Sequence, residues 1–169
     1  MTHIAFRHPL QCTEETYWTH CIFQEEYNRQ LYLEQLRFPA YETLERKEDA
    51  EFLFQRVRIT PLLPPLPGPV KKLIGEHLNY VEEGTFNKAK KQYSFTIIPS
   101  VLAQKLSFSG LLYCISEGEK KCVRTIEIDV NVQLFGIGRL IEELLLQELR
   151  KSYDISQRFT DAYVSHRLG

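Results

Sequence analysis

The sequence lacks an excess of positive charge and any long apolar run. It has 21 Lys and Arg residues against 22 Asp and Glu among 169 residues, so it offers no net positive charge to neutralise a phosphate backbone. We therefore expect no nucleic-acid partner. No apolar run approaches the roughly 18 residues of a membrane-spanning helix, and the N-terminal residues contain no apolar stretch typical of a secretory signal. We expect a cytoplasmic protein without stable insertion into a membrane.

Side chains that bind metals are few and scattered. The four cysteines are Cys12, Cys21, Cys114 and Cys122. No two of them have the two- to four-residue spacing of zinc ligands, and the histidines are dispersed as well. We expect free thiols that pack as small hydrophobic side chains, and we expect neither a metal nor a cofactor.

Catalytic motifs are missing too. The sequence has no G-x-S-x-G elbow around a serine and no glycine-rich phosphate loop. Acyl transfer and nucleotide chemistry are therefore disfavoured, and no catalytic residue is assigned. We expect a binding protein rather than an enzyme.

What the sequence does have is the composition of a folded domain. Hydrophobic residues make up 43% and charged residues 25%, the balance of a globular protein rather than of a disordered chain. A chain of this length normally forms one hydrophobic core. We therefore expect residues 1–169 to form a single domain.

The strongest periodic signal lies near the C-terminus. Apolar residues recur there at intervals of three and four, with acidic and amide residues between them, as in an amphipathic helix. They are Ile137, Leu140, Ile141, Leu144, Leu145 and Leu149. The pattern can continue through Tyr153 to Tyr163, although Asp154–Ser156 could break or bend it. This is the longest helix that the sequence predicts.

Four segments before that helix alternate apolar and polar residues with the period of two of a β-strand. The segments are 78–86, 93–97, 106–114 and 125–134. Alternation with one apolar face is typical of antiparallel sheets, since strands of parallel sheets are usually apolar on both faces. Polar loops at 87–91 and 116–121 turn between neighbouring segments. The order predicts a four-stranded antiparallel meander.

The first third of the chain predicts shorter elements. Ile4 and Phe6 indicate an opening strand, and Thr13 followed by two glutamates begins one or two helices that end near Leu36. Two further strands are expected near 38–46 and 51–60. Two sets of apolar residues compete for the inner face of the second strand. One set is Leu53, Val57 and Ile59, and the other is Phe52 and Phe54.

A proline-rich segment, Pro61–Pro69, separates those strands from the meander. It cannot donate a ladder of backbone hydrogen bonds, so it is not a central strand. We interpret it as a stiff connector packed against the mouth of the sheet, followed by a helical turn at Val70–Ile74. A recognition ligand for a PxxP-reading domain is the alternative.

A sheet of about seven strands with one apolar face must cover that face, and the C-terminal helix is the one predicted element that is long and apolar enough. This layout resembles the START-like (SRPBCC, helix-grip) superfamily over nearly the whole chain. Pro64–Pro67 and Glu127–Gly138, which runs into Glu142, resemble a bacterial START-like subfamily of unknown function. The resemblance implies an α+β helix-grip fold, with a curved antiparallel sheet around the C-terminal helix. It also implies a cavity between them that binds lipids or other apolar small molecules, and it transfers no catalytic residue.

The residues expected to line that cavity lie on the inner rows of the strands and the helix. They are Tyr80, Glu82, Tyr93, Phe95, Phe108, Leu112, Ile128, Val130, Val132, Leu140, Ile141 and Leu144. Leu144 lies in the middle of the helix stripe and should contact both the sheet and the cavity. Core packing also requires aromatic residues, so the sequence alone does not separate a lined cavity from a filled core. Gly84 and Gly110 in the inner rows favour space or a bend.

Three side chains could carry chemistry. Glu82 is a carboxylate on an inner row, where burial would raise its pKa, but a bulge in the strand would place it in solvent. Arg56 could meet an anionic headgroup at the cavity mouth or lie solvated on the outer face. His8 could carry a proton or simply accept a hydrogen bond at a strand end.

Three functions follow from these patterns. The first is binding of an apolar or lipid-like small molecule, for transport or sensing, and we favour it. The second is a small cavity enzyme that uses Glu82, with His8 or Arg56, for proton transfer. The third is a protein-interaction domain that docks through the proline-rich segment or the tail Ser165–Gly169, and the sequence names no protein partner.

Overall fold

The computed structural model describes residues 1–168, which form seven strands and six helical segments, two of them π-helical. The strands are β1 (Thr2–Leu10), β2 (Ala40–Glu48), β3 (Phe52–Thr60), β4 (Tyr80–Asn87), β5 (Gln92–Pro99), β6 (Leu106–Ser116) and β7 (Cys122–Val132). The helical segments are α1 (Glu14–Thr16), η1 (Tyr17–Ile22), α2 (Glu25–Arg29), η2 (Gln30–Gln35), α3 (Gly68–Ile74) and α4 (Gly138–Leu168). Gly169, the last residue of the tail considered for docking, lies outside the described residues.

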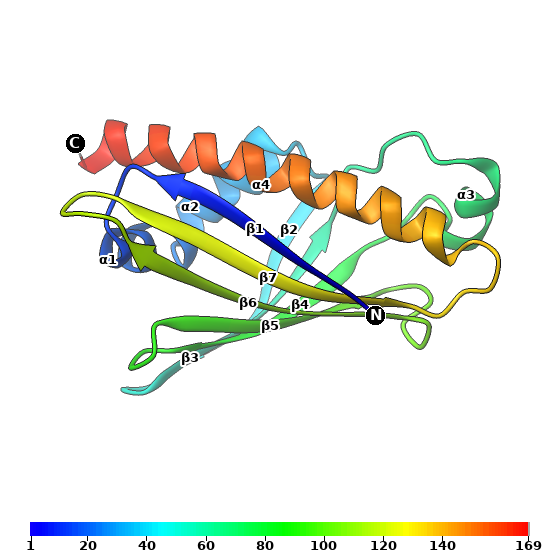
Figure 1. The fold of residues 1–169 in the computed structure, drawn as a ribbon, viewed down its shortest axis with the longest axis horizontal. Helices are drawn as coiled ribbons and strands as arrows, with labels where there is room; N and C mark the ends of the chain where they lie inside the picture. The colour runs from blue at the N-terminus through cyan, green and yellow to red at the C-terminus, as the bar shows by residue number, and fades with distance from the viewer. Residues whose placement is uncertain (169) are drawn as a thin grey trace.

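The strands form one antiparallel sheet in the order β1-β7-β6-β5-β4-β3-β2. β4 to β7 are neighbours in chain order, which confirms the predicted meander, and β1 adds to its edge beside β7. Figure 1 shows α4 running along one side of the curved sheet, with α1 and α2 near its C-terminal end and α3 near its start. The α+β helix-grip fold is therefore confirmed.

Alternation along each strand explains how the sheet presents one apolar face to α4. In β7, which pairs with β1 and β6, the predicted apolar row is buried from Ile126 to Val130. The same alternation resolves the inner face of β3. The buried set is Leu53, Val57 and Ile59. Phe52 belongs to the opposite face and is 40% exposed.

α4 is one unbroken helix, and the break considered at Asp154–Ser156 does not occur. His8 Nε2 lies 2.9 Å from Asp154 Oδ1, and Arg124 Nη1 donates to Ser156 Oγ at 2.8 Å. These polar side chains are bound by partners on the sheet, so they do not compete for the helix backbone. Among residues 1–168, no helix combines the length and the apolar character that crossing a membrane requires.

The helix begins later than its apolar stripe. Gly136 turns the chain at a φ of +77°, a left-handed conformation that glycine adopts without strain, and α4 starts at Gly138. Leu140 lies on the outer side of the first turn, one position before the buried Ile141, and is 37% exposed. The prediction that Leu140 faces the sheet is corrected on this ground. Leu144 is half-buried and packs against the core.

We predict that Ile141→Ala lowers the free energy of unfolding by about 2–5 kcal/mol, because it removes a side chain that is 2% exposed at the interface of helix and sheet. Leu144→Ala should cost less, since Leu144 is only half-buried. Glu143→Ala, on the exposed side of the same turn, should change stability by no more than about 0.5 kcal/mol. Urea titration of the three variants measures these differences. Equal effects at Ile141 and Glu143 would contradict a helix gripped by the sheet.

Candidate functional site

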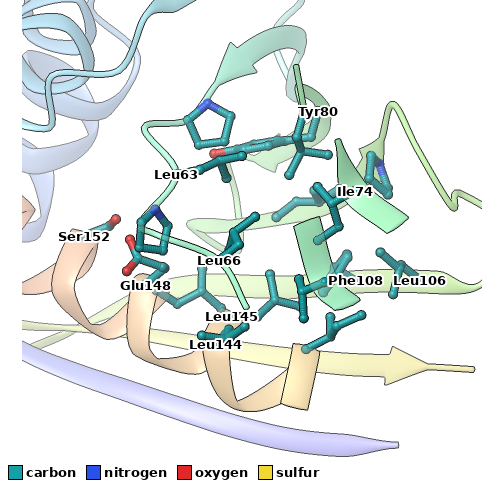
Figure 2. Close-up of a pocket in the computed structure, with 18 of the residues that line it drawn as sticks. Leu63, Leu66, Ile74, Tyr80, Leu106, Phe108, Leu144, Leu145, Glu148 and Ser152 are labelled. Atoms are coloured by element: carbon teal, nitrogen blue, oxygen red, sulfur yellow. The ribbon is translucent and has the colours of Figure 1, made fainter. Parts of the chain in front are cut away.

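A cavity of about 180 Å³ lies between the first half of α4, the proline-rich segment and the sheet, and we call it the outer cavity. α4 contributes Leu144 and Leu145, and the sheet contributes Phe108. Figure 2 shows these side chains converging on one space, with Leu66 of the proline-rich segment in the middle of the view. The cavity is thus bounded by parts of the chain that are far apart in sequence.

The proline-rich segment supplies one part of this wall. Leu63 and Leu66 line the outer cavity, and so does Val70 on α3, which is fully buried. Proline fixes φ and removes backbone donors, so the segment can form a stiff wall without pairing to a strand. This placement agrees with the interpretation of a connector packed against the mouth of the sheet.

Three polar side chains reach the outer cavity, namely Tyr80, Glu148 and Ser152. Glu148 and Ser152 lie one turn apart on α4 and are close together in Figure 2. The other described residues that line the cavity are apolar. The wall therefore offers a large apolar surface and few hydrogen-bonding partners.

A second cavity of about 90 Å³, the inner cavity, lies further along the same face of the sheet. The two linings share no residue, but they are adjacent on three strands. The adjacent pairs, outer before inner, are Tyr80 and Glu82 on β4, Ile97 and Phe95 on β5, and Ile128 and Ile126 on β7. Residues i and i+2 of a strand lie about 7 Å apart on one face. The two cavities are therefore neighbours in the groove between α4 and the sheet.

Glu82 faces the inner cavity. β4 pairs with β3 and β5 without a register shift, so the bulge that would turn Glu82 into solvent does not occur. Tyr93 Oη donates a hydrogen bond to Glu82 Oε2 at 2.9 Å, and Gln55 Nε2 donates to Tyr93 Oη at 3.3 Å. Glu82 keeps some accessible surface, yet protein encloses it, because that surface borders the cavity. Burial raises the pKa of Glu82, and the hydrogen bond from Tyr93 opposes part of this rise.

Two glycines make room for aromatic rings beside Glu82. The Tyr93 ring lies over Gly84 on the neighbouring strand, and a Cβ at Gly84 would come within 1.9 Å of Tyr93 Oη. Phe95 lies over Gly110 in the same way, with its ring 2.3 Å from where a Cβ would be. The glycines that interrupt the inner rows thus permit the close approach that brings Tyr93 to Glu82.

Tyrosines surround Glu82. Burial first and the Glu82 carboxylate second raise the pKa of five phenols, which we call the tyrosine cluster. Its members are Tyr32 on η2, Tyr41 on β2, Tyr80 on β4, Tyr93 on β5 and Tyr153 on α4. The rings of Tyr32 and Tyr41 stack with centroids 4.6 Å apart. The cluster draws on five separate elements, so only the folded chain assembles it.

Arg124 also lines the inner cavity and joins β7 to α4. It is 1% exposed, its Nη1 donates to Ser156 Oγ at 2.8 Å, and its Nη2 donates to the Tyr153 carbonyl oxygen at 3.1 Å. The guanidinium lies 6.0 Å from the centroid of the Tyr17 ring and 5.9 Å from that of Tyr153. These contacts compensate a buried charge with hydrogen bonds and aromatic faces.

The predicted lining residues are divided between the two cavities. Those in the outer cavity are Tyr80, Phe108, Ile128, Ile141 and Leu144. Those in the inner cavity are Glu82, Tyr93, Phe95 and Leu112. Three predicted residues line neither cavity. Val130 is enclosed by the core, Val132 packs beneath the start of α4 beside Gly138, and Leu140 faces outward.

Arg56 and His8 do not line either cavity. Arg56 Nε binds Glu83 Oε1 at 2.9 Å on the outer face of the sheet, which is the solvated alternative. His8, on β1, is buried beside α4, where burial lowers its pKa and the hydrogen bond with Asp154 opposes this shift. Neither residue meets Glu82.

Sequence reasoning missed most polar residues of the inner cavity. Tyr32, Tyr41, Gln55, Arg124 and Tyr153 are five of them. Three of them carried a periodic signal. Gln55 lies on the same strand parity as Leu53, Arg124 lies two residues before the inner row of β7, and Tyr153 lies four residues after Leu149. The residues next to Tyr32 and Tyr41 in the sequence show no periodic pattern that would place these tyrosines at a cavity.

The other three cysteines influence the thiol of Cys122 or are influenced by it. Hydrogen bonds from the thiols of Cys114 and Cys12 lower the pKa of Cys122. Burial raises the pKa of Cys21 to about 12, and Cys122 adds to this rise. All four are free thiols, and no group of three His, Cys, Asp or Glu side chains within residues 1–168 could hold a metal ion.

We predict that Glu82 makes the protein less stable as the pH rises. Its pKa is raised by folding, so the stability that it contributes is complete below the unfolded pKa and is lost as the pH rises through the folded pKa. Glu82→Gln stays neutral, so its stability relative to the wild type should increase as the pH rises from the unfolded pKa of glutamate through the folded pKa of Glu82. Glu83→Gln is the matched control, because Glu83 pairs with Arg56 on the outer face. Chemical unfolding across this range is the measurement, and a pH-independent effect of Glu82→Gln would show that the carboxyl is not buried.

Solved structures of other proteins have the same fold. Zhui aromatase/cyclase from Streptomyces sp. R1128 superposes with a TM-score of 0.67 at 10% identity, covering 99% of this chain and 96% of that chain. Norcoclaurine synthase from Thalictrum flavum, in complex with dopamine and hydroxybenzaldehyde, gives 0.68 at 12% identity, covering 98% and 87%. A START superfamily protein from Mycobacterium smegmatis gives 0.59 at 11% identity, covering 97% of each chain. At these identities the likeness shows the START-like fold alone.

One protein-family model matches nearly the whole sequence. A search of curated proteins finds no match. The model of a family described as "Protein of unknown function (DUF2505)" matches residues 6–164. That range includes every residue that lines the two cavities. The chain therefore belongs to this family of unknown function, DUF2505, and has the START-like helix-grip fold.

Proposed function

We propose that this protein binds an apolar, lipid-like small molecule in the outer cavity, as a carrier or a sensor. The observation that carries the proposal is the chemistry of the wall, which is apolar except for Tyr80, Glu148 and Ser152. A molecule bound there would remove apolar surface from water on both sides of the contact, at about 25 cal/mol for each Å². Such a wall favours an apolar ligand over a charged one.

The packing around the outer cavity supports this reading over a filled core. Leu145 and Leu149 pack against the core, yet they remain half-buried because part of their surface borders the cavity. A cavity of roughly 150 Å³ lined by Leu, Ile and Phe is large enough to bind benzene. The outer cavity, at about 180 Å³, can therefore hold a ring or a short chain.

Solved structures of the same fold support the proposal that the ligand is a small organic molecule. The norcoclaurine synthase structure contains dopamine and hydroxybenzaldehyde, and Zhui is an aromatase/cyclase. Low identity transfers no residue role from them. The class of ligand proposed for this chain therefore depends on its own cavity wall.

A small cavity enzyme is the second candidate, and one observation favours it. Glu82, a carboxyl with a raised pKa, meets Tyr93 and the rest of the tyrosine cluster in one enclosed space. Such groups are suited to proton transfer. Proton exchange at the ligand's acidic C–H bonds, followed by NMR in deuterated water, would reveal it, and Glu82→Gln should abolish the exchange.

Docking of a protein on the proline-rich segment is the third candidate. Leu63 and Leu66 already form the wall of the outer cavity. A partner that took up these side chains would open the cavity. Partner and ligand should then compete, so saturating the protein with an apolar probe should weaken a pull-down of the partner.

We predict that Leu144→Trp blocks binding, because a larger side chain at this position of the wall occupies the outer cavity. Native mass spectrometry of the gently purified protein, together with displacement of a fluorescent lipid probe, measures binding. The probe should bind Leu144→Trp at least about tenfold more weakly than the wild type. Leu146→Trp is the matched control, since Leu146 lies on the same helix but outside the lining, and it should bind as the wild type does. Wild-type protein that carries no adduct and binds no probe would disprove the proposed function.

A further inference from the structure

We propose that the inner cavity binds the protonated amine end of the ligand, with the Glu82 carboxylate as its counter-ion, while the apolar body of the ligand lies in the outer cavity. This inference rests on the proposed function and adds the chemical class of the ligand, an amphipathic amine. Four observations carry it: the neighbouring positions of the two cavities, the absence of a cationic partner for Glu82 among the described residues, the tyrosine cluster and the position of Arg124.

Tyr80 marks the boundary between the two cavities on β4, because it lines the outer cavity and Glu82, two residues further on, lines the inner one. Its side chain lines the outer cavity, and its phenol lies within the electrostatic influence of Glu82 in the inner cavity. On α4 the same boundary falls between Ser152, which lines the outer cavity, and Tyr153, which lines the inner one. A molecule extended along the groove would therefore bring its end to Glu82.

Glu82 has no cationic partner among the described residues that could neutralise it. Its Oε2 accepts the hydrogen bond from Tyr93, whereas Oε1 has no hydrogen bond to residues 1–168. Its pKa reflects burial and the Tyr93 hydrogen bond, without a contribution from a basic side chain. A buried carboxylate is costly unless a charge of opposite sign accompanies it. An ammonium group beside Oε1 would provide that charge.

Glu82 shares the inner cavity with neutral polar side chains, four of them from the tyrosine cluster. Among them are Tyr32, Tyr41, Tyr93, Tyr153 and Gln55. Phenol rings attract organic cations through their electron-rich faces, and this attraction is stronger where water is excluded. A carboxylate among tyrosines is therefore complementary to an amine and unfavourable for an anion.

Arg124 argues against an amine ligand, because its positive charge would repel one. It is the one basic side chain among the described residues of the inner lining. Its Nη1 and Nη2 are bound to α4, but its Nε has no hydrogen-bond partner within residues 1–168. A ligand with a carboxylate end would bind that guanidinium, whereas a ligand with an amine end would bind Glu82. We favour the amine because Arg124 is 1% exposed, whereas Glu82 keeps accessible surface toward the cavity.

The test uses three probes that share one chain and differ in their polar end, namely octylamine, octanol and octanoate. Isothermal titration near neutral pH measures their affinities for the wild type, Glu82→Gln and Glu83→Gln. The wild type and Glu83→Gln should bind octylamine at least about tenfold more tightly than octanol. Glu82→Gln should bind octylamine and octanol equally. The preference of the wild type for octylamine should also diminish as the pH falls through the folded pKa of Glu82, since the carboxylate becomes neutral.

The outcomes separate this inference from the proposed function. Equal binding of octylamine and octanol by the wild type would overturn the amine assignment and leave the apolar cavity in place. Octanoate as the tightest probe would also overturn it, in favour of Arg124. An undiminished preference for octylamine in Glu82→Gln would place the amine elsewhere. If the wild type binds none of the three probes, the proposed function itself fails.

Discussion

The buried guanidinium of Arg124 attaches α4 to the sheet, and the layout of both cavities depends on this attachment. A charge in the core is costly unless hydrogen bonds compensate it. Arg124 Nη1 and Nη2 find Ser156 Oγ and the Tyr153 carbonyl oxygen as acceptors on α4, and Nη2 also lies 3.4 Å from His8 Nδ1 on β1. The middle of the helix therefore cannot leave β7 without exposing an unpaired charge.

This attachment divides α4 into two halves with different packing. On the C-terminal side of its contact with Arg124, α4 makes polar contacts with the rest of the chain. Tyr27 Oη and Thr160 Oγ1 form a 2.6 Å hydrogen bond, and Gln157 Nε2 donates to the Pro9 carbonyl oxygen at 2.9 Å. On the N-terminal side of that contact, the helix packs through residues 141–149 on apolar side chains around the outer cavity. The first half of α4 and the proline-rich segment therefore meet across apolar side chains, several of which are half-buried at the outer cavity.

The strands were predictable because alternation is local to each strand. The inward face of Glu82 followed from its parity with Tyr80 and Gly84, and the unbroken register of β4 preserves it. The tyrosine cluster was not predictable in the same way, because it depends on how η2 and β2 approach the sheet. Leu140 shows the opposite error: its apolar spacing predicted a residue that faces the sheet, but it lies in the first turn of α4 and is 37% exposed. Patterns in sequence therefore identified the groove, while its polar chemistry required the tertiary structure.

The central claim is that one groove holds an apolar body in the outer cavity and a polar end at Glu82. The most direct test is a crystal structure of the protein purified from cells without added ligand. Our account predicts continuous electron density from the outer cavity, beside Leu66 and Leu144, to within hydrogen-bonding distance of Glu82 Oε1. Side chains that fill the outer cavity, or density for ordered water alone in both cavities, would contradict it.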